Sequence, residues 1–80
     1  MPYISEEDKM TLRDIERTYH LSPYAIANIA FVDISVIYRM EQGGPLPTKV
    51  VEHILRRLSE VTGQDYSMAT VGGYWIEKEE

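Results

Sequence analysis

The chain has 80 residues, a formal net charge of −5 and no cysteine. This length suits one small domain near the lower limit for a self-sufficient core. The absence of cysteine excludes disulfides and thiolate metal sites. No apolar run approaches the length of a membrane span, and the acidic N-terminal segment is unlike a secretory signal. We therefore expect a cytoplasmic protein that does not enter a membrane and that carries no cofactor.

The negative charge is concentrated at the two ends of the chain. Between Met10 and Ile76, seven acidic residues stand against six basic ones. The body of the domain is therefore close to neutral, a balance that permits binding to nucleic acid without indicating it.

The first predicted helix follows an acidic segment, residues 1–9, that is expected to be flexible. Thr11 and Asp14 have the spacing of a capping box, so a helix should begin after Thr11. Its apolar face should consist of Leu12, Ile15 and Tyr19.

Two short helices should follow in residues 23–30 and 34–42. Ser22 and Pro23 are the preferred types for an N-cap and a first helical position, and Asp33 is a second N-cap. Gly43 and Gly44 should supply the left-handed residue that ends the second helix. Helical spacing predicts that Ile26, either Ile29 or Ala30, Ile37 and Met40 face the core.

The longest helix should follow the loop of residues 43–47, with Thr48 as its cap and Gly63 as its end. Ser67 is a candidate cap for one more turn. Residues 72–80 form a C-terminal tail in which Tyr74 and Trp75 suit a short strand, packing on the core or a dimer contact. The predicted fold is all-α: a compact bundle of four to five short helices in which residues 10–71 contain a helix-turn-helix.

The residue pattern resembles the lambda-repressor-like helix-turn-helix domains, the Cro or Xre family, over roughly residues 12–71. Ile26-Ala27 stands where the family carries Leu-Ala in a Ser-capped helix. Val32, Asp33 and Ile37 match the positions that follow, and Glu41-Gln42-Gly43 matches the Glu-x-Gly ending. A Pro-bearing loop and an amphipathic helix come next in both.

Three positions depart from the family pattern. Phe31 and His20 stand where glycine is common, and because a left-handed Phe costs roughly 1–2 kcal/mol, the turn at Phe31 is expected to be built differently. Glu16 stands where the family often has an Arg that pairs with the counterpart of Glu41. Glu16 should repel Glu41, with Arg13 or Arg17 taking over the pairing.

The resemblance implies a sequence-specific DNA-binding module of a transcriptional regulator, with the helix at residues 34–42 in the major groove of double-stranded DNA. The positions that reach base edges in the family correspond to Ile34, Ser35, Tyr38 and Arg39. Among these, Arg39 suits a guanine edge and Ile34 a thymine methyl group. The candidates for phosphate contact are Ser22, Tyr24, Asn28, Gln42 and Lys49.

A second interpretation stays open, because this face carries a single cation among apolar residues. The chain would then be a protein-protein interaction domain that keeps the helix-turn-helix frame without binding DNA. A homodimer is compatible with either interpretation. His20 and His53 are isolated, so no metal site is expected, and Arg56 and Arg57 are expected on a solvent-facing edge. No motif indicates an enzyme.

Overall fold

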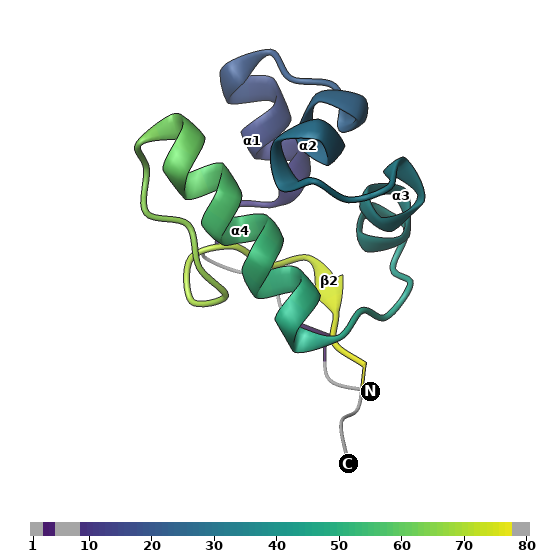
Figure 1. Cartoon of the computed structure of the whole chain (residues 1–80). Coiled ribbons are helices and arrows are strands. Elements are labelled where there is room, and N and C mark those ends of the chain that lie inside the picture. Colours follow the sequence, from purple (N-terminus) through teal and green to yellow (C-terminus); the bar gives the residue numbers. More distant parts are fainter. Residues whose placement is uncertain (1–2, 5–8, 78–80) are drawn as a thin grey trace.

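The computed structural model describes residues 3–4 and 9–77 and has a mostly helical architecture (Figure 1). In these residues it contains four helices and one small two-stranded sheet. The elements in chain order are β1 (Tyr3–Ile4), α1 (Leu12–Tyr19), α2 (Pro23–Ala30), α3 (Ile34–Glu41), α4 (Thr48–Thr62) and β2 (Tyr74–Trp75). No helix in the described part of the chain is long and apolar enough to cross a membrane.

The first two helices begin as their cap residues predict. The Asp14 amide donates to Thr11 Oγ1 at 3.2 Å, and the Thr11 amide donates to Asp14 Oδ2 at 2.9 Å, which completes a capping box. These bonds, chiefly the one from the Thr11 backbone, lower the pKa of Asp14. At α2, Ser22 Oγ accepts from the Ala25 amide at 3.2 Å and Pro23 is the first helical residue.

Later in the chain, one predicted cap was placed wrongly and one is confirmed. Thr48 is the first residue of α4, and the N-cap is Pro47. The ring of Pro47 has no atom that could accept a capping hydrogen bond. Ser67 caps a single turn, as predicted, because its Oγ accepts from the Ala69 amide at 3.2 Å. Its carbonyl accepts from the amides of Thr70 at 3.0 Å and Val71 at 2.9 Å, which closes the turn.

One apolar core joins all the helices and the C-terminal strand. Ile26, Ala30, Ile37 and Met40 are buried as predicted, and Ala30 rather than Ile29 takes the fully buried position in α2. From α4 the core receives Val51, Ile54, Leu55 and Leu58, whereas Val61 is exposed. Helix α4 packs against α2, and β2 lies on the same side of α4 in Figure 1.

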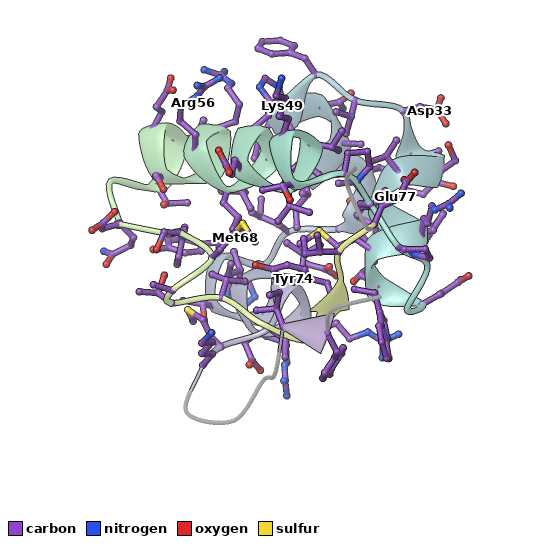
Figure 2. The ribbon with its side chains drawn as sticks, turned by 90° about the horizontal axis from the view of Figure 1, so that it is seen from below. Asp33, Lys49, Arg56, Met68, Tyr74 and Glu77 are labelled. Atoms are coloured by element: carbon purple, nitrogen blue, oxygen red, sulfur yellow. The ribbon has the colours of Figure 1, made fainter. Side chains whose placement is uncertain are left out.

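The two ends of the described chain are tied together. Tyr3 pairs with Trp75 and Ile4 with Tyr74 in an antiparallel ladder, so Tyr3 and Ile4 are not part of the flexible segment expected for residues 1–9. Tyr74 is 1% exposed and points into the interior (Figure 2). The tail therefore completes the core, in contrast to the partly exposed Trp75, which packs against Tyr3 with ring centroids 4.9 Å apart.

Candidate functional site

The connection between α2 and α3 consists of Phe31, Val32 and Asp33. Phe31 is left-handed, with φ at 57°, so the expectation of a differently built turn is wrong. The amide of Phe31 donates to Asn28 O at 3.3 Å, and that of Val32 donates to Ala27 O at 3.0 Å. These bonds satisfy the last carbonyls of α2, which offsets the cost of the strained residue.

The Phe31 side chain is 76% exposed, and the Arg57 guanidinium lies 4.7 Å from the centre of its ring. A cation over an aromatic face contributes about 0.5–1 kcal/mol at an exposed site. His20, the other position where glycine was expected, is also left-handed, with φ at 55°, and follows the last residue of α1.

Two side chains from α4 hold the end of α2. His53 Nε2 donates to the Ala30 carbonyl at 2.6 Å, and Arg57 Nε donates to the Ile29 carbonyl at 3.0 Å. The Arg57 side chain is only 25% exposed, so its placement on a solvent-facing edge was wrong, whereas Arg56 is exposed. Sequence spacing gives no sign of these bonds, because the partners are more than 20 residues apart.

Asp33 fixes the start of α3. Its Oδ2 accepts from the Ser35 amide at 3.0 Å, and the hydrogen bonds to Ser35 lower the pKa of Asp33. With Ile37 and Met40 buried, the opposite face of α3 is open. Three of the four candidates for base contact, Ser35, Tyr38 and Arg39, are exposed there. Ile34 is half-buried and packs against the core, which limits the methyl contact that was expected of it.

Arg39 is anchored to the loop that follows α3. Its Nε donates to the Pro45 carbonyl at 2.9 Å. Its side chain crosses Gly44 so closely that a Cβ atom there would collide with Arg39 Cγ. The bond to Pro45 uses Nε and not the two terminal nitrogens of the guanidinium. Arg39 is therefore held in place while its two terminal nitrogens remain available for a bidentate contact.

The exposed side of α3 borders a groove of about 910 Å³, here called the α3 groove. The α3 wall carries Ser35, Tyr38, Arg39 and Gln42, and the opposite wall includes Leu46, Pro47, Val50 and Glu77. The α3 groove thus collects the three exposed base-contact candidates and one of the phosphate-contact candidates. Glu77 was not among the predicted site residues, because nothing in the sequence places residue 77 beside α3.

The other candidates for phosphate contact lie on separate elements. Tyr24 is exposed and meets Tyr38 edge-on, with ring centroids 6.3 Å apart, so it adjoins the candidate surface. Ser22 and Asn28 are exposed on α2, and Ser22 Oγ already caps that helix. Lys49 points away from the core near the start of α4, on the same outer side as Arg56 (Figure 2).

A pair of carboxyl groups, Glu16 and Glu41, joins α1 to α3. The Glu41 side chain is 7% exposed and lies 3.9 Å from Arg13 Nε, so Arg13 takes over the predicted pairing, whereas Arg17 binds Asp14. Burial, followed by a hydrogen bond with Glu41 and its charge, raises the pKa of Glu16 to about 8. A pKa of about 8 favours the protonated form of Glu16 at neutral pH, which removes the predicted charge repulsion with Glu41.

The charges near α3 balance. Arg39 and Lys49 are the exposed cations on α3 and at the start of α4, and Asp33 and Glu77 are exposed acids beside the same helix. No protein-family model matches this chain, and no curated protein or solved structure matches it either.

Proposed function

We propose that this chain is a sequence-specific DNA-binding module of a transcriptional regulator, with α2 and α3 forming a helix-turn-helix. The observation that carries the proposal is the exposed face of α3, held outward by its buried face and by the Asp33 cap. Eight helical residues span roughly 12 Å, a length that fits the major groove.

The roles of the polar residues follow from their positions. Arg39 would offer its terminal nitrogens to a guanine edge, while Ser35 and Tyr38 lie on the same exposed face. Lys49 and the hydroxyl groups of Ser22 and Tyr24 would contact phosphates, which fixes the helix in the groove without reading sequence.

The charge balance beside α3 favours a second candidate function, a protein-protein interaction domain. The α3 groove contains Val36, Leu46 and Val50 together with one cation and one acid. A neutral surface of this kind suits a protein partner better than a polyanion.

A salt-dependent titration with random and selected duplexes separates the two functions. DNA binding should be weak on random duplex and should have a shallow salt slope, because few cations are available. Arg39→Ala should reduce binding to a selected duplex by about 1–3 kcal/mol and relax the preference at one base pair. Lys49→Ala should weaken binding to all sequences alike. Absence of binding at low salt would refute the DNA-binding proposal and favour the protein partner.

The Arg39→Ala experiment needs a measure of folding. Arg39 is exposed and its bond to Pro45 is a surface bond, so the free energy of unfolding should change by no more than roughly 0.5 kcal/mol. A variant that keeps both its fold and its affinity would show that α3 does not read DNA through Arg39.

A further inference from the structure

The position of Glu77 is fixed by the main chain. Its amide donates to the Leu46 carbonyl at 2.7 Å, and the Leu46 amide donates to the Trp75 carbonyl at 3.1 Å. Leu46 and Ile76 are both buried on this ladder. Because side chains alternate along an extended segment, the buried Ile76 turns Glu77 outward, where it is exposed.

The same loop connects Glu77 to the proposed reading face. Leu46, which binds the Glu77 amide, follows Pro45, whose carbonyl accepts from Arg39. Glu77 and Arg39 both line the α3 groove. Figure 2 shows Glu77 beside α3, in contrast to Tyr74, which points into the interior.

We propose that Glu77 is a specificity-determining residue of this surface: its carboxylate repels DNA phosphates and thereby suppresses binding to duplexes that α3 does not read. The inference rests on the proposed DNA-binding function. A carboxylate within a Debye length of the phosphates weakens the sequence-independent part of DNA binding. Base contacts by α3 compensate for this lost affinity only on a duplex whose sequence matches them. Specificity gained by a repulsive group of this kind needs no new attractive contact.

The test compares Glu77→Gln with Asp65→Asn, which removes the same charge elsewhere. Asp65 is exposed and lies beyond the C-terminal end of α4, whereas Val50 in the α3 groove lies in the first turn of that helix. At about 50 mM salt a charge at that end is screened more strongly from a ligand in the α3 groove than the charge of Glu77 is. The tail is held by the Glu77 backbone amide and not by its side chain, and the Asp65 side chain is exposed. Both variants should therefore keep the melting temperature of the native chain.

The probe is a random-sequence duplex of about 20 base pairs, titrated by fluorescence anisotropy. Glu77→Gln should bind it about three- to tenfold more tightly than the native chain at about 50 mM salt, and the gain should shrink as salt is added. Asp65→Asn should change the affinity by less than about twofold.

The outcomes separate this inference from the function on which it rests. If the native chain binds the duplex and the two variants bind equally well, Glu77 has no special role and the inference is overturned while the proposed function stands. If neither the native chain nor Glu77→Gln binds random or selected duplexes at low salt, both are overturned. If the native chain binds a selected duplex and Glu77→Gln alone gains affinity for the random duplex, both are supported.

Discussion

The raised pKa of Glu16 should make the stability of this domain depend on pH. The pKa of Glu16 rises from its ordinary 4.5 to about 8 in the folded chain, because the group is buried and faces Glu41. Between these two pH values the folded chain holds a proton that the unfolded chain has released. Folding stability from this pair is therefore fully present below about pH 4.5 and is lost as pH rises through about 8.

The size of the loss follows from the shift. At about 1.4 kcal/mol for each pH unit, the full change would be roughly 5 kcal/mol. Water around the partly exposed Glu16 screens the repulsion, so we expect about 1–3 kcal/mol. Glu16→Gln keeps a hydrogen-bond donor toward Glu41 and carries no charge. The stability of this variant should therefore not fall as the pH rises through about 8.

Urea unfolding at pH 5 and pH 8.5 provides the assay. The free energy of unfolding of the native chain should fall by about 1–3 kcal/mol between these values, and that of Glu16→Gln should fall much less. Glu52→Gln, which changes an exposed side chain on α4, should behave like the native chain. Equal pH profiles for the native chain and Glu16→Gln would refute the raised pKa of Glu16.

Two further predictions concern the α2–α3 turn and the tail. Phe31→Gly should be about 1 kcal/mol more stable to urea than Phe31→Ala, because both lose the Arg57 contact but only glycine relieves the left-handed strain; equal stability would show that the turn is unstrained. Deletion of residues 72–80 should abolish cooperative unfolding measured by circular dichroism, because the buried Tyr74 and Ile76 are lost at about 3–5 kcal/mol for each large side chain. A folded monomer after this deletion would instead make the tail a dimer contact.

Local signals in the sequence determined most of the helical architecture. Thr11, Ser22 and Asp33 bind amides two or three residues away, and Gly43 and Gly63 adopt the left-handed conformation at helix ends. These effects act within one turn of chain, so residue type and spacing are enough to predict them. The buried face of α3 was equally predictable from helical periodicity, and it leaves Ser35, Tyr38 and Arg39 on the outside.

Only the tertiary structure decided the features that join distant segments. The raised pKa of Glu16 depends on how α1 lies against α3, and the His53 bond to Ala30 depends on how α4 crosses α2. The strand pairing between Ile4 and Tyr74 joins residues 70 positions apart, and the bond from Glu77 to Leu46, which sets Glu77 in the α3 groove, joins residues 31 positions apart. Periodicity and capping describe neighbours along the chain, whereas burial and charge at these sites depend on which segments meet when the core closes.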